Sequence, residues 1–371
     1  MNILITTAGW KGALTCMRSL AKKGHSISLV SSDQYAPSLY SKFCKEKIIS
    51  PKERDKEAYL KFLLPFIKEK KYDLLIPMSD LCIEYFSQIQ DDLSKYVKIL
   101  LPPKESIDIT LNKDKTYRFA SQNGVAIPDT YFPGSIPEVE IIANKITYPC
   151  VVKKPKGSSG SGNTYIEKKE YLVTFFSKLP ENGPWPVVQE FITSPSSSFT
   201  AVCKEGQILD FFMYQRIRQY PEIGGITVFA KSVFDEQALE ASSLLLKKLS
   251  WNGPMSLDYF IIKDKGFVLS EINSRFSGLI QFAYACGVDL PSKLFELIFE
   301  KNIRPTEKRY KTGIYYRSIF PEEIDSCLEN KKYISCFFIN FLRPNTKYDF
   351  SIFDPNLLLW QIKNARWSIF V

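Results

Sequence analysis

Three side chains that offer oxygen ligands fall within one predicted hairpin near residue 265. The run MSLDYFIIKDKGFVLSEINSRF predicts two strands that turn at Lys265-Gly266. Glu271 and Asn273 are two residues apart and share one strand face, and the register can bring Asp258 close to Glu271. Magnesium prefers one or two carboxylates together with substrate phosphates. The run therefore predicts a magnesium site, with a solvent-exposed sheet face as the alternative.

A second group that could bind phosphate is the segment YPCVVKKPKGSSGSGNTYI at 148–166. It predicts a hairpin with a long glycine- and serine-rich tip, whose backbone N–H groups can approach an anion closely. Lys153, Lys154 and Lys156 add positive charge, and Arg275 on the other hairpin can also contact phosphate. The segment lacks the G-x-x-x-x-G-K-[ST] pattern. It favours a phosphate-covering loop over a surface hairpin without a ligand.

Candidate substrate residues lie in YQRIRQYPEIGGITVFAKS. Arg216 and Arg218 are two apart on a predicted strand, so they share a face and could fork onto a carboxylate or phosphate. Gly224 and Gly225 allow a ligand to approach the backbone closely. Surface arginines beside an ordinary turn are the alternative.

The elements before residue 105 predict an open parallel sheet. An apolar strand at 2–6 is followed by a helix that Gly24 ends and by the strand SISLVSSD. A helix around 55–70 and strands at 72–80 and 97–103 complete the pattern. The turn TTAGWKGAL is not a G-x-G-x-x-G fingerprint, which argues against a dinucleotide site.

The rest of the chain predicts helices mixed with antiparallel hairpins. Helices are expected at 111–128 and 235–249, and a strand at 186–191 leads into the strands SFTAVC, ILDFFMY and ITVFAKSV. Near the end, TGIYYRSIF and ISCFFINFL read as strands before an aromatic tail. Trp360 and Trp367 in that tail are expected to pack in a core or a dimer interface.

Composition excludes several classes of function. The 371 residues carry 49 Lys plus Arg and 40 Asp plus Glu, a net charge of +9, which permits anionic ligands without indicating a nucleic-acid groove. A single histidine, His25, excludes zinc sites of the H-E-x-x-H type. The eight cysteines show no C-x-x-C spacing and predict reduced core residues. With no membrane-spanning run and no signal-peptide pattern, we expect a cytoplasmic protein without a membrane partner.

The order of these motifs resembles the ATP-grasp superfamily, most closely its carboxylate–amine ligase branch related to the carbamoyl-phosphate synthase large subunit and biotin carboxylase. The resemblance rests on LNKDKTYRFASQNGVAIP, YPCVVKKPKGSSGSG, VVQEFI and the run from MSLDYF to LSEINSRFSG, and it covers roughly residues 1–300. It implies an α/β protein in which a Rossmann-like pre-ATP-grasp domain precedes a two-subdomain α+β ATP-grasp fold. The implied boundaries are 1–105, 106–185 and 186–305, with a C-terminal α/β extension at 306–371.

The resemblance also implies a role for each matching residue. Lys113 and Lys153 would bind the nucleotide phosphates, and Arg275 would stabilise the transferred phosphate. The flexible loop would comprise Gly157, Ser158, Ser159, Gly160 and Gly162, the adenine hinge Gln189, Glu190, Phe191 and Ile192, and the metal site Asp258, Glu271 and Asn273. Arg216, Arg218, Gly224 and Gly225 would lie beside the reaction centre. Two departures are Ser198, where the family carries an acid, and the pair Lys153-Lys154 before Pro155.

The implied reaction is an ATP- and Mg²⁺-dependent (or Mn²⁺-dependent) ligation. A small-molecule carboxylate would be activated as an acyl phosphate and joined to an amine, with release of ADP and phosphate. The partners would be these substrates and no nucleic acid, and a homodimer is compatible with the resemblance. A nucleotide-binding regulatory protein without ligase activity is the alternative, and a basic nucleic-acid-binding protein is a further one. A carboxylating enzyme of the biotin-carboxylase type is a variant of the ligase interpretation.

Overall fold

The computed structural model describes residues 1–157, 162–180, 183–300, 303–306 and 310–364. The chain begins with a four-stranded parallel sheet in the order β3-β2-β1-β4. These strands are β1 (Asn2–Ile5), β2 (Ser26–Ser31), β3 (Glu46–Ile49) and β4 (Leu74–Ile76). The helical elements around them are α1 (Lys11–Lys22), η1 (Pro37–Tyr40), α2 (Lys56–Lys70), α3 (Asp80–Gln88) and α4 (Gln90–Leu93). The predicted N-terminal parallel sheet is confirmed.

One predicted strand of this sheet is wrong. Residues 97–103 form no named strand, and only an isolated bridge joins Lys98 to Leu74. Pro102 and Pro103 lack the N–H groups that a ladder needs, so the segment cannot continue as a sheet strand. The edge strand β3 was not anticipated, because EKII has two polar residues followed by two apolar ones and shows no strand-like alternation.

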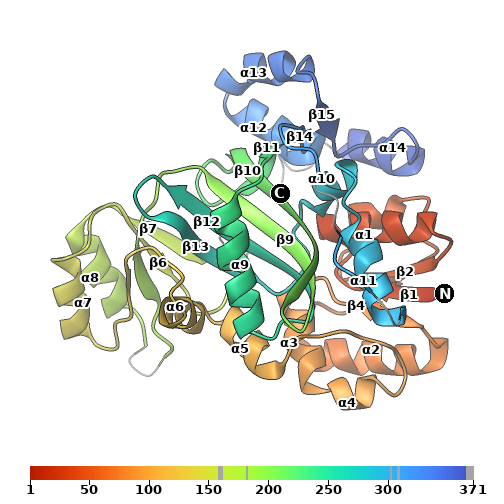
Figure 1. The fold of residues 1–371 in the computed structure, drawn as a ribbon, viewed down its shortest axis with the longest axis horizontal. Helices are drawn as coiled ribbons and strands as arrows, with labels where there is room; N and C mark the ends of the chain where they lie inside the picture. The colour runs from red at the N-terminus through yellow and green to blue at the C-terminus, as the bar shows by residue number, and fades with distance from the viewer. Residues whose placement is uncertain (158–161, 181–182, 301–302, 307–309, 365–371) are drawn as a thin grey trace.

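A second, antiparallel sheet has the order β5-β8-β6-β7. Its strands are β5 (Thr130–Tyr131), β6 (Cys150–Lys153), β7 (Asn163–Ile166) and β8 (Val187–Glu190), and its core includes α7 (Ile136–Ala143) and α8 (Lys169–Ser177). Helices α5 (Lys104–Leu111) and α6 (Lys113–Gln122) lead into it. In Figure 1 this lobe stands apart from the N-terminal domain, at the other side of the molecule.

The third sheet has seven strands in the order β13-β12-β9-β10-β11-β14-β15 and is antiparallel except for the β14–β15 pair. Its strands are β9 (Ser196–Lys204), β10 (Gln207–Tyr220), β11 (Ile226–Ser232), β12 (Gly253–Ile262), β13 (Gly266–Asn273), β14 (Tyr315–Arg317) and β15 (Thr346–Tyr348). Helix α9 (Glu236–Lys248) covers one face, while α10 (Ile280–Ala285) and α11 (Leu290–Phe299) pack against α1 and join this sheet to the N-terminal core. The predicted α+β arrangement with hairpins is confirmed.

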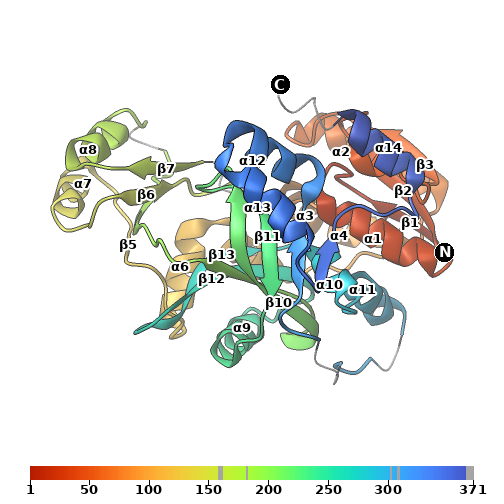
Figure 2. The ribbon, with the colours of Figure 1, turned by 90° about the horizontal axis from the view of Figure 1, so that it is seen from above.

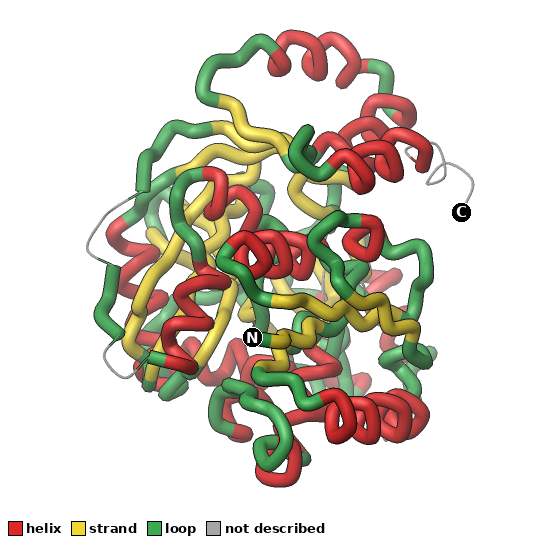
Figure 3. Tube along the Cα trace, turned by 90° about the vertical axis from the view of Figure 1, so that its right-hand side faces the viewer, coloured by secondary structure: helices red, strands yellow, loops and turns green. Residues whose placement is uncertain are grey.

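The C-terminal extension follows β14 as a kinked turn, η2 (Ile319–Glu323), and the helices α12 (Ile324–Glu329), α13 (Lys332–Phe341) and α14 (Pro355–Asn364). Figure 2 shows α14 beside the N-terminal domain and α13 near the edge of the seven-stranded sheet, and Figure 3 shows the helices and strands of the molecule from a third side. The prediction that ISCFFINFL is a strand is wrong, because these residues belong to α13. No helix in the described residues is both long and apolar enough to cross a bilayer.

Candidate functional site

A cavity of about 1210 Å³ lies between the two antiparallel sheets, the N-terminal domain and the C-terminal extension. Most of the residues predicted for the site line it, and they come from both sheets and from the start of α6. They are Lys113, Lys153, Gln189, Glu190, Phe191, Ile192, Arg216, Arg218, Gly224, Gly225, Asp258, Glu271, Asn273 and Arg275. The structure therefore brings together residues that are up to 162 positions apart, from Lys113 to Arg275.

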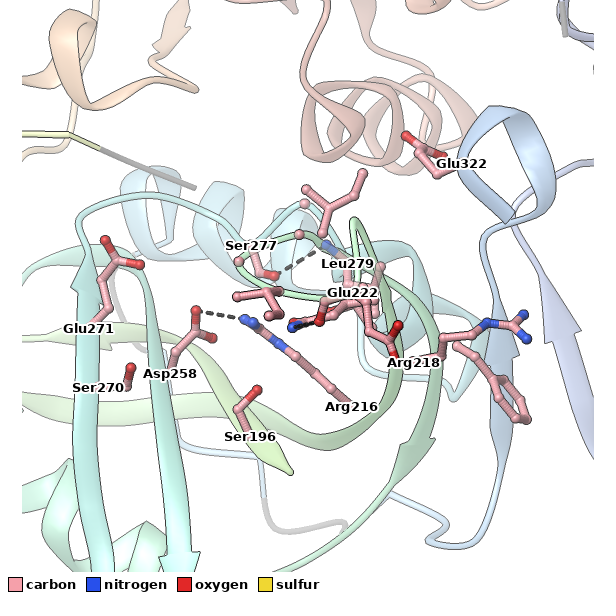
Figure 4. Close-up of a pocket in the computed structure, with 18 of the residues that line it drawn as sticks. Ser196, Arg216, Arg218, Glu222, Asp258, Ser270, Glu271, Ser277, Leu279 and Glu322 are labelled. Carbon is pink, nitrogen blue, oxygen red and sulfur yellow. Dashed lines mark hydrogen bonds and ion pairs between the residues drawn. The ribbon is translucent and has the colours of Figure 1, made fainter. Parts of the chain in front are cut away.

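The two carboxylates of the predicted metal site face each other across adjacent strands. Asp258 on β12 pairs directly with Glu271 on β13, and Ser256 pairs with Asn273. The turn at Gly266, where φ is +67°, sets the register only as far as Tyr259, and a one-residue shift between Tyr259 and Asp258 then brings Asp258 opposite Glu271. Figure 4 shows both carboxylates on neighbouring strands at the edge of the cavity. Two carboxylates and an amide oxygen suit a hard cation that also binds phosphate oxygens.

Both carboxylates already face cations. The Lys113 ammonium lies 2.6 Å from Glu271 Oε1, and Arg216 Nη2 lies 2.6 Å from Asp258 Oδ2. Burial alone would raise the pKa of Glu271, but the charges of Lys113, Lys153 and Arg275 outweigh it, so that pKa lies below its usual range. Glu271 is therefore an anion at neutral pH, as a metal ligand must be.

Lys153 is a buried cation with no carboxylate on its ammonium in the described residues. It is 8% exposed, and its ammonium donates a hydrogen bond of 2.7 Å to the Tyr117 hydroxyl. That hydroxyl in turn donates a 2.6 Å bond to the Ser270 carbonyl, which fixes its orientation. Burial, with the nearby Lys113 charge, lowers the pKa of Lys153 to about 7. Such a group gains most from an anion brought into the cavity.

Arg275 is positioned by the N-terminal domain. Its guanidinium lies 4.3 Å from the centre of the Trp10 ring, and its Nε lies 3.4 Å from Asp80 Oδ2. A 3.2 Å hydrogen bond also runs from its Nη2 to Asn273 Oδ1. The cation thus sits at the junction of the parallel sheet and the metal-site strand.

The predicted common face of Arg216 and Arg218 is wrong. The β10–β11 register shifts between these two residues, so the simple two-residue alternation is broken. Arg216 turns toward Asp258 (Figure 4), whereas Arg218 is ion-paired with Glu323 of the extension. Each guanidinium thus has a carboxylate partner of its own, and the two do not fork onto one anion.

The departure at Ser198 has a structural consequence. Ser198 on β9 is directly opposite Asp258, and its hydroxyl donates a 2.5 Å hydrogen bond to Asp258 Oδ1. Arg216 Nη2 also approaches this hydroxyl at 3.4 Å. A serine at this position therefore holds the Asp258–Arg216 pair together, where an acid would add a third charge.

The predicted nucleotide hinge and loop are only partly described. Gln189 to Ile192 line the cavity, and the Glu190 backbone N–H donates to the Asp129 carbonyl at 2.9 Å. In the loop, the Gly157 carbonyl accepts a 3.1 Å bond from the Lys113 ammonium. Ser158, Ser159 and Gly160 lie outside the described residues, as does Trp367, whereas Trp360 stacks on Tyr40 with ring centres 5.3 Å apart.

Sequence reasoning missed the residues that hold the site residues in place. Tyr117 could have been found, because it lies four residues after Lys113 on one helix and so on the same face. Trp10, Asp80 and Glu323 gave no local signal, because each reaches the site from a different part of the chain.

Comparison with known proteins bears on the predicted resemblance. Residues 110–279 match the model of the ATP-grasp domain, which confirms the resemblance to that superfamily. A formate-dependent phosphoribosylglycinamide formyltransferase of Prochlorococcus marinus subsp. pastoris is 27% identical over 232 residues, which are 56% of this chain and 55% of that protein. A carbamoyl phosphate synthase large chain of Saccharolobus solfataricus is 23% identical over 258 residues, 66% of this chain and 24% of that protein. The chain thus spans about half or less of the length of these curated relatives.

Solved structures share the fold. A biotin carboxylase from Campylobacter jejuni, in a β-γ-ATP complex, superposes with a TM-score of 0.68 at 18% identity, over 85% of this chain and 74% of that one. An N5-carboxyaminoimidazole synthetase from Staphylococcus aureus, complexed with ADP, gives 0.68 at 14% identity over 90% and 86%. At these identities the likeness concerns the fold alone.

Proposed function

We propose that this protein is an ATP- and magnesium-dependent ligase that activates a carboxylate as an acyl phosphate and joins it to an amine. The observation that carries the proposal is the buried Lys153 ammonium, without an acidic partner in the described residues, in the cavity that Asp258 and Glu271 also line. A cation in one wall and oxygen ligands in another suit a polyphosphate with its metal. Solved structures of similar fold that are complexed with ADP or with ATP agree with this use.

Each residue has a distinct task in the proposed reaction. Lys113 and Lys153 bind the phosphates, and Glu271, Asn273 and Asp258 hold magnesium, which supplies charge neutralisation when bound. The substrate carboxylate oxygen bonds to the γ-phosphorus as the bond from that phosphorus to the ADP oxygen breaks. The amine then attacks the acyl carbon, phosphate leaves, and the amine proton passes to solvent. Arg275, held by Trp10 and Asp80, stabilises the negative charge of the acyl phosphate.

The chain's own groups perform this chemistry by position and charge. Both paired cations, Lys113 and Arg216, must exchange their carboxylates for ligand groups when the metal and nucleotide bind. No protein nucleophile is required for the two steps, and the contribution is orientation and electrostatic stabilisation.

The proposal is tested by trapping the intermediate. Purified protein is incubated with Mg-ATP, a panel of carboxylic acids and hydroxylamine, and hydroxamate and ADP are quantified together. We expect one acid class to give equal amounts of both products, and Glu271→Gln to abolish both. If acids stimulate ADP formation but none of them yields a hydroxamate, the result contradicts acyl phosphate chemistry.

A regulatory nucleotide-binding protein is the second candidate, because Asp258 is tied to Arg216 and Ser198 rather than free for a metal. It predicts Mg-ATP binding without acid-dependent ADP release. The hydroxylamine experiment separates it from the ligase.

A further inference from the structure

A buried tyrosine, Tyr117 on α6, lies behind the wall of the cavity and has no task in the proposed reaction. It is 1% exposed and does not line the cavity itself. Its hydroxyl nevertheless makes two hydrogen bonds to the site, one with Lys153 Nζ at 2.7 Å and one with the Ser270 carbonyl at 2.6 Å. Lys153 ends β6 of the four-stranded antiparallel sheet and Ser270 belongs to β13 of the seven-stranded sheet, so one hydroxyl joins the two sheets.

The directions of both hydrogen bonds follow from the chemistry of the partners. A carbonyl oxygen only accepts, so the Tyr117 hydroxyl donates its single proton to Ser270. Burial raises the pKa of Tyr117, so the phenol keeps this proton at neutral pH. The hydroxyl oxygen is then left to accept from the Lys153 ammonium. An acceptor that is fixed in this way favours the charged form of the lysine.

The Lys153 ammonium is held from one side. An ammonium has three N–H donors, and Tyr117 takes one of them. No other residue that the structure describes accepts a hydrogen bond from Lys153. The ammonium also lies 5.3 Å from the centre of the Tyr117 ring, close enough for a favourable contact between cation and ring. The remaining donors are left for an anion in the cavity that Lys153 lines.

Helix α6 fixes this arrangement relative to the metal-site strand. Lys113 and Tyr117 lie four residues apart on one face of α6. The Lys113 ammonium lies 2.6 Å from Glu271 Oε1, and Tyr117 bonds to the adjacent Ser270 (Figure 4 labels Ser270 and Glu271). Two contacts one helical turn apart resist rotation of α6 against β13. The acceptor for Lys153 therefore has a set position relative to Glu271.

We propose that Tyr117 is a positioning residue that holds the Lys153 side chain, as a cation, in place for the nucleotide phosphates. The proposal rests on the proposed function, because Lys153 is assigned there to these phosphates. Without the hydroxyl, the ammonium would be buried with no acceptor in the described residues, which favours the neutral amine. A neutral amine attracts phosphate less strongly than an ammonium, so the effect of losing the hydroxyl should grow as the pH rises.

The test removes one hydroxyl, in Tyr117→Phe, and measures the Kd of the non-hydrolysable nucleotide AMP-PNP with Mg²⁺ by calorimetric titration at pH 6 and pH 8. The charged groups that face Lys153 are Lys113 on α6, Asp258 on β12 and Glu271 on β13, and all three are retained in the variant. We expect the Kd at pH 8 to rise on the order of tenfold over the wild type, as for the loss of a hydrogen bond to a charged group. The rise should be much smaller at pH 6, where more of the lysine is protonated in both proteins.

Tyr310 provides a matched control. Its hydroxyl also accepts one hydrogen bond, from the Met213 backbone N–H at 3.0 Å, and donates one to a carbonyl, that of Val233 at 2.7 Å. Tyr310 does not line the cavity. Tyr310→Phe therefore loses a hydroxyl of the same bonding pattern, but its Kd for Mg-AMP-PNP should match that of the wild type at both pH values.

Urea unfolding gives a readout that needs no nucleotide. The pKa of Lys153 is about 7 in the folded wild type, and loss of the hydrogen bond should lower it. Between pH 6 and pH 7 the folded variant would then bind fewer protons at this site than the unfolded chain does, so its free energy of unfolding should rise more steeply with pH. Tyr310→Phe should keep the wild-type slope. In a double variant that also carries Lys153→Met, the steeper rise should disappear.

The outcomes separate the positioning role from the proposed function. If the wild type binds Mg-AMP-PNP and Tyr117→Phe binds it equally well at both pH values, or with the same loss as Tyr310→Phe, the positioning role is rejected and the nucleotide site stands. If the wild type does not bind Mg-AMP-PNP, the proposed function fails. The unfolding slopes then still decide whether Tyr117 keeps Lys153 charged, and equal slopes in the wild type, Tyr117→Phe and Tyr310→Phe would reject it.

Discussion

Lys153 gives the cavity a positive charge that no neighbouring carboxylate in the described residues balances. Lys153 is 8% exposed and, among the residues that the structure describes, its ammonium is hydrogen-bonded to a neutral hydroxyl and to no acid, so its burial is costly. Its neighbours Lys113 and Arg216 are paired with Glu271 and Asp258, so their charges are balanced. The unbalanced cation marks where an anion is expected.

The lowered pKa of Lys153 predicts a pH dependence of stability. The pKa falls from 10.5 in the unfolded chain to about 7 in the folded protein. Between these values the unfolded chain binds more protons at this site, so the free energy of unfolding rises with pH, by on the order of 1 kcal/mol per pH unit. Urea unfolding at pH 7, 8 and 9 should show this rise in the wild type and a smaller one in Lys153→Met.

The neighbouring lysine provides the control. Lys154 is exposed, so Lys154→Met should keep the wild-type dependence on pH. Identical slopes for the wild type and Lys153→Met would show that Lys153 is protonated as in water.

At the scale of elements, the hairpins place the site. The β12–β13 hairpin sets Asp258 opposite Glu271, and the β10–β11 connection brings Gly224 and Gly225 to the cavity. Gly224 has φ of +70°, in the region that favours glycine. A Cβ on Gly225 would lie 2.0 Å from the Pro221 carbonyl oxygen, so only glycine fits this turn.

We predict that Gly225→Ala displaces the turn and lowers acid-dependent ADP formation at least tenfold. The reason is that the turn lines the cavity, where Gly224 lies beside Tyr165 and the Tyr165 ring packs on Phe191 of the predicted hinge. Gly134→Ala is the matched control, because its Cβ would meet only Glu138 Oε2 at 3.8 Å. Equal ADP formation by both variants would show that the turn has no part in turnover.

Local patterns account for the elements that could be predicted from sequence. Both hairpins of the site follow from apolar strands around glycine turns, but the pairing of Asp258 with Glu271 also depends on a register shift beside Tyr259 that the residue types do not show. ISCFFINFL could not be assigned, because a short apolar run fits a strand and a helix equally. In the structure it forms α13, which places Phe337 on the Arg317 guanidinium at 4.6 Å.

Some features of the site could not be predicted from the sequence, because they depend on distant contacts or on irregular geometry. Trp10 and Asp80 meet Arg275 only because the N-terminal domain packs against the segment that matches the ATP-grasp model. The bulge that separates Arg216 from Arg218 leaves no signature in the residue types.

At the scale of the molecule, the C-terminal extension packs against the N-terminal domain. Arg18 on α1 and Asp354 before α14 form a buried pair, and Asp354 also accepts hydrogen bonds from Ser41 Oγ at 2.6 Å and the Lys42 backbone at 3.0 Å. The carboxylate thus satisfies three groups of the N-terminal domain. The extension can then serve as a fixed wall of the cavity.

Removal of this carboxylate should be costly. Asp354→Ala leaves the Arg18 cation buried and unpaired, so the free energy of unfolding should fall by about 3–5 kcal/mol. The measurement is urea unfolding, with limited proteolysis to show whether the extension is cut first. Asp92→Ala, which breaks the exposed pair with Lys95, should leave stability nearly unchanged. An equally small loss of unfolding free energy in Asp354→Ala would show that the Arg18–Asp354 pair does not stabilise the fold.

Mg²⁺-dependent binding of AMP-PNP to the wild type and three variants tests the central claim most directly. We predict that Mg-AMP-PNP raises the melting temperature of the wild type and of Lys154→Met. At a ligand concentration of 100 times the Kd, the free energy of unfolding increases by about 2.7 kcal/mol. Lys153→Met and Glu271→Gln should lose most of this rise, and omission of Mg²⁺ should remove it from the wild type. A wild type that melts at the same temperature with and without Mg-AMP-PNP would contradict the nucleotide site and the function built on it.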